Sequence, residues 1–401
     1  MTLAVLAAVV AGGYATAVGA AEIPGPTIAL AAGAERTVDA DPTPPQRLVD
    51  AQSAPSAVGW LDGEAVWSNT DAAAPIASIS KLATALVCQE AQPVAPGDDG
   101  PVHVWSAEDR ARQDAYLARD GVAFPIPVGT EVTTRQMLTL ALVPSANDFA
   151  AAYAYAVFGD TETFVAAVDD WAARNGLGSL ELFEPTGMDE RNVASPADLV
   201  KLARLALAHP TIAEFTAMPR AELPWGIGEV ESTNPLFGML PDVVGAKTGA
   251  TDVAGYNLAA AQRTTVSGRE LVQIAVVLGR DSDEDRAAAS AALLAALAAM
   301  PRPVETVTEG ERIGTATTAD GHAVPLLAEA SARSVLAPGE GAARTARLRG
   351  IAAGASGRAA GAIRIDAPTG SAEVAVLTGS AISDPGYWWR FTHPALVFGW
   401  A

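Results

Sequence analysis

The chain has 401 residues, enough for two domains, and 50% of them are hydrophobic against 18% charged, which excludes a mostly disordered protein. Its formal charge of −20 at pH 7 repels phosphate backbones, so we expect no nucleic-acid partner. A single cysteine, Cys88, excludes an internal disulfide framework and thiolate metal sites, and the four histidines are too scattered to form an imidazole metal site.

The N-terminal segment predicts export from the cytoplasm. Residues 3–21 form an uninterrupted run of apolar and small residues, and Glu22 and Pro24 end it. That length fits either a secretory signal peptide or a short membrane anchor, so we assign residues 1–21 to one of these two. From residue 22 to 45 the composition turns to Pro, Ala, Gly and Asp, which predicts a linker.

Residues 46–301 predict an α/β domain. A hairpin is expected over 58–68, where Asp62-Gly63 supplies the turn, and helical periodicity then continues to about residue 212. Strand-like apolar runs return over 243–278, and an Ala/Leu-rich helix follows them up to Pro301. Strands at both ends of a helical region indicate a sheet with helices packed on it.

The remaining C-terminal residues predict a second, smaller domain. Short β-type runs alternate with turn pairs such as Asp320-Gly321 and Thr369-Gly370, which indicates a small all-β domain over 302–383. Residues 384–401 form an aromatic tail. Because Pro394 interrupts any amphipathic helix, we expect this tail to pack against the β domain.

Lysine is rare in this chain, and its positions stand out. Of the 26 basic residues, three are lysine (Lys81, Lys201 and Lys247) and the other 23 are arginine. An arginine stays protonated at any working pH, whereas a buried lysine can lose its proton and act as a base. The lysines are therefore the first candidates for acid–base chemistry.

The first candidate motif is Ser78-Ile79-Ser80-Lys81. The apolar spacing after Pro75 predicts a buried helix, and a lysine three residues after a serine lies on the same face of that helix. A lysine with a lowered pKa can take the proton of a serine hydroxyl and so make it a nucleophile. Taken alone, the same pattern also fits an N-capping serine beside a solvated lysine.

Two further motifs follow along the chain. Ser145-Ala146-Asn147 comes after an apolar helix, where it could relay a proton and hold an amide or could simply form a turn. Lys247-Thr248-Gly249 ends a strand-like run, and Gly249 permits close approach of a substrate to the backbone. Ala246 directly before the lysine excludes a phosphate-binding P-loop, and no G-x-S-x-G elbow occurs.

The order S-x-x-K, S-x-N, K-T-G resembles the serine D-Ala-D-Ala carboxypeptidase family, which belongs to the low-molecular-mass penicillin-binding proteins. The flanking sequences Thr233-Asn234-Pro235-Leu236 and Ala254-Gly255-Tyr256-Asn257-Leu258 strengthen the resemblance, which covers about residues 46–300. It implies an α/β fold in which a β-lactamase/transpeptidase-like catalytic domain of sheet and helices precedes a small all-β domain.

The resemblance also implies a role for each motif residue. Ser78 would attack the penultimate D-Ala of a peptidoglycan stem peptide, and Lys81 would accept its proton. The backbone N–H groups of Ser78 and Ala250 would form the oxyanion hole. The implied remaining roles are proton relay for Ser145 and substrate binding for Asn147, Lys247, Thr248 and Gly249.

These roles imply no metal or organic cofactor, an extracytoplasmic location, and peptidoglycan stem peptides and β-lactam antibiotics as ligands. The alternatives are a β-lactamase, a transpeptidase or endopeptidase using the same residues, and a non-catalytic scaffold that binds the cell wall. The absence of an E-x-x-L-N sequence argues against the β-lactamase, because the deacylating glutamate of class A enzymes then has no candidate. Intact Ser78 and Lys81 argue against the scaffold.

Overall fold

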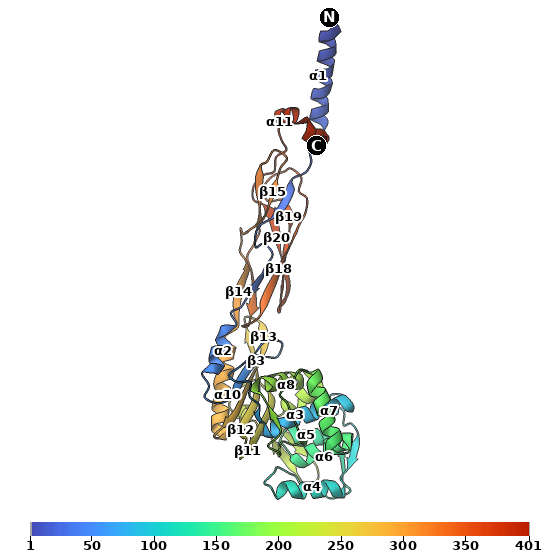
Figure 1. The fold of residues 1–401 in the computed structure, drawn as a ribbon, viewed down its shortest axis with the longest axis vertical. Helices are drawn as coiled ribbons and strands as arrows, with labels where there is room; N and C mark the ends of the chain where they lie inside the picture. The colour runs from blue at the N-terminus through green and yellow to red at the C-terminus, as the bar shows by residue number, and fades with distance from the viewer. Residues whose placement is uncertain (1, 401) are drawn as a thin grey trace. The chain divides into compact units, whose positions relative to one another are not determined.

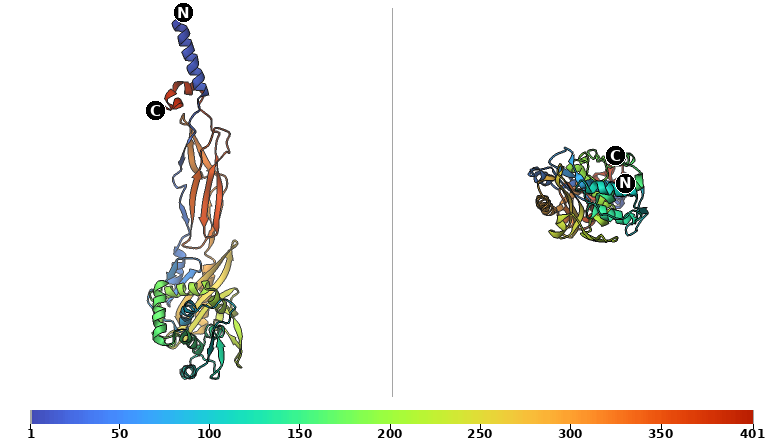
Figure 2. Two further views of the ribbon diagram at one scale, coloured as in Figure 1. Left: turned by 90° about the vertical axis from the view of Figure 1, so that its right-hand side faces the viewer. Right: turned by 90° about the horizontal axis from the view of Figure 1, so that it is seen from below.

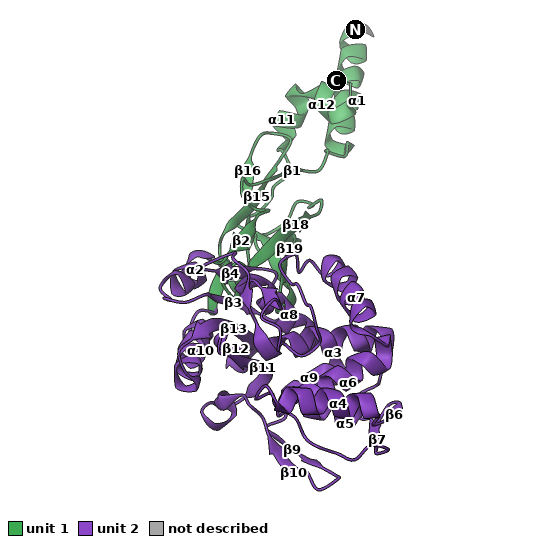
Figure 3. Ribbon diagram, turned by 60° about the horizontal axis from the view of Figure 1, so that its bottom comes forward, with its two compact units in different colours: residues 1–40, 302–401 green, residues 41–301 purple. Residues whose placement is uncertain are grey.

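The computed structural model describes residues 2–400, and these divide into two compact units (Figure 3). The larger unit comprises Asp41–Pro301. The smaller unit is built from the described residues on either side of that range. Each unit contains its own cluster of buried hydrophobic side chains, as expected of two independent domains.

The larger unit is organised around an antiparallel sheet in the strand order β11-β12-β13-β3-β4 (Figure 1). Strand β11 therefore lies at an edge of this sheet. Strands β3 and β4 form the hairpin predicted over residues 58–68. The five strands are β3 (Ser56–Trp60), β4 (Val66–Ser68), β11 (Val243–Thr251), β12 (Gly255–Val266) and β13 (Arg269–Arg280).

Helices cover this sheet: α10 contacts β12 and β13, and α8 contacts β13 and β3. The helices are α2 (Thr43–Asp50), α3 (Ser80–Ala91), α4 (Ala107–Leu117), α5 (Thr134–Leu142), α6 (Asn147–Phe158), α7 (Thr161–Arg174), α8 (Pro196–Ala208), α9 (Pro210–Thr216) and α10 (Asp283–Ala298), with the 3₁₀ helices η1 (Ala77–Ile79) and η2 (Pro235–Gly238). Short strand pairs complete the unit: β5 (Ala74–Pro75) with β8 (Val193–Ala194), β6 (Val102–Val104) with β7 (Glu131–Thr133), and β9 (Arg220–Leu223) with β10 (Gly228–Glu231).

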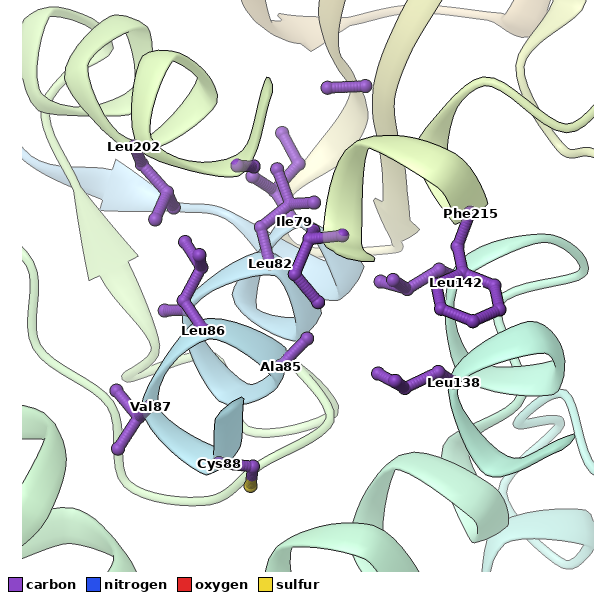
Figure 4. Packing of buried hydrophobic residues seen from close by; sticks show 14 of the residues in the cluster. Ile79, Leu82, Ala85, Leu86, Val87, Cys88, Leu138, Leu142, Leu202 and Phe215 are labelled. Atoms are coloured by element: carbon purple, nitrogen blue, oxygen red, sulfur yellow. The ribbon is translucent and has the colours of Figure 1, made fainter. Parts of the chain in front are cut away.

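Helix α3 lies at the centre of the helical region. Its residues from Ser80 to Gln89 are all buried, so it has no solvent-facing side along that stretch. Leu82 and Leu86 pack among side chains of α5, α8 and α9, including Leu142 and Phe215 (Figure 4). A helix enclosed in this way holds the residues at its N-terminus in fixed positions.

The smaller unit contains a seven-stranded antiparallel sheet in the order β1-β15-β16-β20-β19-β18-β2. A separate pair, β14 with β17, completes it. Its elements are α1 (Thr2–Ala20), β1 (Thr27–Leu30), β2 (Thr37–Asp39), β14 (Arg302–Val307), β15 (Arg312–Thr317), β16 (Ala323–Ala328), β17 (Ala332–Leu336), β18 (Gly341–Leu348), β19 (Ala359–Ala367), β20 (Gly370–Thr378), α11 (Tyr387–Thr392) and α12 (Pro394–Phe398). The predicted α/β fold with an additional all-β domain is confirmed.

The prediction of a linker over residues 22–45 is wrong. That segment contributes β1 and β2, which pair with β15 and β18 at the two edges of the seven-stranded sheet, and it also contains the start of α2. Edge strands are only partly buried and so need few apolar residues. Ile28 and Val38 are half-buried, whereas most of their neighbours are exposed. The composition of such strands therefore resembles that of a linker.

The aromatic tail also differs from expectation, because it packs against α1 instead of the β strands (Figure 2). Tyr14 donates a hydrogen bond to the carbonyl oxygen of Phe391 at 2.8 Å, and the two rings meet edge to face with their centroids 5.0 Å apart. Tyr387 donates to the carbonyl oxygen of Ala15 at 2.9 Å. Trp388 is 73% exposed.

Between residues 2 and 400, no helix combines the length and apolarity needed to cross a membrane.

Candidate active site

Ser78 and Lys81 lie at the junction of η1 and α3. Ile76 and Ile79, both fully buried, hold this junction in the core. Because Lys81 follows Ser78 by three residues in a helical conformation, the two side chains share a face. Lys81 Nζ lies 2.7 Å from Ser78 Oγ. The structure thus brings the predicted nucleophile and the predicted base into direct contact.

Lys81 has two further partners, Asn147 Oδ1 at 2.6 Å and the carbonyl oxygen of Thr186 at 2.7 Å. Burial lowers the pKa of this lysine to about 7, against the opposing effect of the Glu184 and Asp148 charges. In the neutral amine, two N–H bonds can donate to the two carbonyl-type oxygens, which leaves the lone pair directed at Ser78. Such an amine is placed to take the hydroxyl proton.

Ser145 lies in the loop between α5 and α6, and Asn147 is the first residue of α6. The loop is held by backbone hydrogen bonds from Ala146 to Leu140 at 2.8 Å and from Asn147 to Val122 at 2.7 Å. Within it, Ser145 adopts a left-handed conformation with φ of 69°. Asn147 contacts Lys81, whereas Ser145 accepts a hydrogen bond from Lys247 at 2.8 Å. The loop therefore contacts both motif lysines.

Lys247 is a second buried amine, and only 1% of its surface is exposed. Burial holds its pKa well below the ordinary value, and the positive charges of Lys81 and Arg286 act in the same direction. The next residue, Thr248, has its hydroxyl 2.5 Å from that of Thr233. Lys247 and Thr248 on β11 and Thr233 from the segment before η2 thus bring two hydroxyls and an amine together, and such a group of donors can bind a carboxylate.

Gly249 brings the edge strand β11 close to the serine. A Cβ at this position would lie 2.6 Å from the carbonyl oxygen of Ile76 and 3.0 Å from the backbone nitrogen of Ser78. Any larger residue would push β11 away from η1. Ala250 follows as an exposed residue, so the strand end beside the serine is open to solvent.

The sequence analysis missed three residues that support the site: Glu184, Thr186 and Asn192. They lie on the loop that faces Lys81. The carboxylate of Glu184 accepts hydrogen bonds from the backbone N–H groups of Thr186 at 2.8 Å and Gly187 at 2.6 Å, which fixes the Thr186 carbonyl oxygen on Lys81. Asn192, fully buried, donates to Ser80 Oγ at 3.1 Å and to the Glu184 carbonyl oxygen at 2.9 Å. In the sequence, Pro185 and Gly187 indicate a turn at this place, and a turn by itself does not identify functional side chains.

Asp148 follows Asn147 in the first turn of α6. Its carboxylate accepts hydrogen bonds from Gln113 at 2.8 Å and from the backbone N–H of Phe124 at 2.9 Å. Burial raises the pKa of Asp148 to about 6. This buried carboxylate ties α4 and the segment after it to the N-terminus of α6.

A serine hydroxyl against a neutral amine, a second buried amine, and an open strand edge together fit acyl transfer through a serine ester. Comparison with known proteins agrees. The model of the D-alanyl-D-alanine carboxypeptidase family matches residues 65–282, which contain all three motifs. A D-alanyl-D-alanine endopeptidase of Pseudomonas aeruginosa is 29% identical over 211 residues, which are 51% of this chain and 64% of the relative. The first four curated relatives are matched over 52–66% of their own length.

Solved structures show the same fold. A crystal structure of a D-alanyl-D-alanine carboxypeptidase from Mycobacterium tuberculosis is 26% identical with a TM-score of 0.52, and the match covers 64% of this chain and 95% of that one. Penicillin binding protein 5 from Haemophilus influenzae is 20% identical with a TM-score of 0.57, over 82% of this chain and 97% of that one.

Proposed function

This chain belongs to the D-alanyl-D-alanine carboxypeptidase family, and we propose from that premise that it is a serine-type carboxypeptidase. It removes the terminal D-Ala from peptidoglycan stem peptides through an acyl-enzyme. The contact of 2.7 Å between Lys81 Nζ and Ser78 Oγ carries the proposal, since burial has already lowered the pKa of that amine to about 7.

In the acylation step, Ser78 Oγ attacks the carbonyl carbon of the penultimate D-Ala while its proton passes to Lys81 Nζ. The backbone N–H groups of Ser78 and Ala250 stabilise the oxyanion that forms. The close approach of β11 to Ser78 at Gly249 supports this pairing of N–H groups.

In the collapse of the intermediate, the peptide C–N bond breaks and the leaving D-Ala nitrogen takes a proton from Ser145, which is reprotonated by the proton that Lys81 accepted from Ser78. Lys247, which donates to Ser145 at 2.8 Å, supports that transfer and, with Thr248, binds the carboxylate of the leaving residue. Asn147 binds the substrate amide, and Gly249 leaves room for the peptide backbone. A water molecule then attacks the ester carbonyl carbon and gives a proton to Lys81. The bond between that carbon and Ser78 Oγ breaks, and Lys81 returns the proton to Ser78 Oγ.

Penicillins fit the same proposal as inhibitors, because their lactam carbonyl would acylate Ser78 in the same way. A second candidate is endopeptidase action, favoured by the name of the Pseudomonas aeruginosa relative. Both activities would use the same residues, and they differ only in the group that leaves.

The enzyme acts outside the cytoplasm in this proposal, because peptidoglycan lies there. The N-terminal segment of residues 1–21 is suited to direct export. Attachment to the membrane through this segment stays a prediction. Fractionating cells that express the chain with and without its first 21 residues tests it, and membrane-bound activity in the exported, shortened form would contradict it.

Incubation with a peptide ending in D-Ala-D-Ala, followed by mass spectrometry, tests the activity. We expect loss of one alanine with the unaltered chain and with Ser53→Ala, an exposed serine outside the site. Ser78→Ala should leave the peptide intact. Release of alanine by Ser78→Ala at the unaltered rate would contradict the proposed function.

A further inference from the structure

The loop of residues 183–192 is hydrogen-bonded directly to the helix that carries the base. Lys81 Nζ donates to the carbonyl oxygen of Thr186 at 2.7 Å. One helical turn further along α3, the hydroxyl of Thr84 donates to the carbonyl oxygen of Pro185 at 2.8 Å. Two consecutive carbonyl groups of the loop are therefore held by α3, and one of them reaches the catalytic amine.

The carboxylate of Glu184 sets the fold of this loop. One of its oxygens accepts hydrogen bonds from the N–H and from the hydroxyl of Thr186, at 2.8 and 2.6 Å. The other accepts from the N–H groups of Gly187 at 2.6 Å and Asp189 at 3.3 Å, and from the Asn192 amide at 3.2 Å. All these partners are donors, so a carboxylate satisfies them, whereas an amide would direct its own N–H at other N–H groups.

Glu184 is one of several titratable groups around the base. Burial lowers the pKa of Lys81 to about 7, and the negative charges of Glu184 and then Asp148 oppose this effect. Lys247 is near enough for the charge of Lys81 to lower its pKa. On α4, burial and then the charge of Glu184 raise the pKa of Tyr116. Because the other groups are unchanged in a variant of Glu184, a new Lys81 pKa there reports the loss of the Glu184 charge.

Acylation places a new positive charge in this surrounding. When the proton of Ser78 Oγ passes to Lys81 Nζ, a buried neutral amine becomes an ammonium group, which a nearby carboxylate stabilises. Before that step, the Thr186 carbonyl oxygen and Asn147 Oδ1 accept the two N–H bonds of the amine. Its lone pair is then left for the serine proton. The loop thus affects both the orientation of the base and the stability of its protonated form.

Resting on the proposed function, we propose that Glu184 is a positioning residue for Lys81. Its carboxylate folds the turn that holds the Thr186 carbonyl oxygen on the amine, and its charge stabilises the ammonium group formed during acylation. Glu184 touches none of the reacting atoms and exchanges no proton with them. Both its shape and its charge are needed.

The rate of acylation by benzylpenicillin, measured between about pH 5 and pH 9, tests the proposal. In Glu184→Gln we expect the rate at high pH to be about 10- to 100-fold lower, because the amine is no longer held in place. The inflection near pH 7 should also move down by about one pH unit, because the ammonium group has lost a stabilising charge. Glu184→Asp keeps the charge on a shorter side chain. It should keep the inflection and have an intermediate rate.

Glu190→Gln is the matched control, since Glu190 is an exposed acid on the same loop. It should keep both the rate and the inflection. A Glu184→Gln profile with the unaltered inflection would overturn the proposal, because a purely structural role lowers the rate without moving the inflection. An unaltered rate at high pH would overturn it as well.

Circular dichroism shows whether each variant folds. If Glu184→Gln does not fold, Glu184→Asp decides the question: a reduced rate with the inflection kept supports the proposal, and a shifted inflection or an unaltered rate overturns it. Failure of the proposed function looks different, because the unaltered chain would then form no penicillin adduct at any pH.

Discussion

Lys247 donates a hydrogen bond to Ser145 at 2.8 Å, although the two residues are 102 positions apart in the chain. Lys81 reaches the same loop from the other side by its contact of 2.6 Å with Asn147. The side chains of a lysine from the sheet and a lysine from the central helix therefore both contact residues 145–147. This loop is fixed between two buried amines, and the account of catalysis depends on that arrangement.

Replacing Lys81 with arginine should abolish acylation by penicillin. The positive charge is kept, but a guanidinium cannot accept the serine proton at any working pH. Lys201→Arg is the control, because Lys201 is partly exposed and pairs with Asp198 outside the active site. Stopped-flow acylation and circular dichroism of each variant provide the measurement. A folded Lys81→Arg chain that acylates at the unaltered rate would remove Lys81 from the role of base.

The acylation rate should depend on pH with an inflection near pH 7. Below the Lys81 pKa of about 7 the amine is protonated, so the rate should fall about tenfold per pH unit, and above it the rate should level off. Stability should respond as well. The unfolded chain keeps this proton up to the ordinary pKa of 10.5, so the contribution of Lys81 makes the free energy of unfolding rise between about pH 7 and pH 10.5. A flat rate between pH 5.5 and pH 8.5 would contradict the assignment.

Gly187→Ala should inactivate the site, because the added Cβ would overlap the neighbouring backbone. A Cβ at Gly187, whose φ is +87°, would overlap the carbonyl oxygen of Ala77, next to the nucleophile. A displacement of that size predicts a loss of acylation of about 100-fold. The control is Gly176→Ala, which has a φ of +67° and no atom within 4 Å of its added Cβ. It should cost only about 1–2 kcal/mol of stability from backbone strain and keep its acylation rate. Equal rates in the two variants would contradict the packing argument.

The larger unit should acylate without the smaller one. Residues 41–301 contain all three motifs and a hydrophobic cluster of their own. We expect a chain limited to these residues to react with penicillin at close to the rate of the full chain. A soluble, folded fragment that forms no adduct would show that the β domain shapes the active site.

The motif residues could be located from the sequence because their geometry is local or strongly patterned. A helical S-x-x-K segment places Lys81 on Ser78 through backbone geometry alone. The contacts of Glu184 and Asn192 could not be foreseen in this way. They depend on how a loop folds back over α3, and their side chains serve mainly backbone groups that the sequence does not reveal.

Strands β1 and β2 were missed for a different reason. Each is an edge strand of three or four residues, half-buried at most, and periodicity over so short a span is indistinguishable from that of a linker. The pairing of the C-terminal aromatic residues with α1 was missed because it joins the two ends of the chain. Tyr14 and Phe391 are 377 residues apart, and no local pattern links them.

Intact-protein mass spectrometry after incubation with benzylpenicillin tests the central claim most directly. Ser78 acting with Lys81 predicts a covalent adduct of one penicillin per chain, located by peptide mapping on Ser78 and absent from Ser78→Ala. An unmodified, folded chain, or an adduct on a residue other than Ser78, would contradict it.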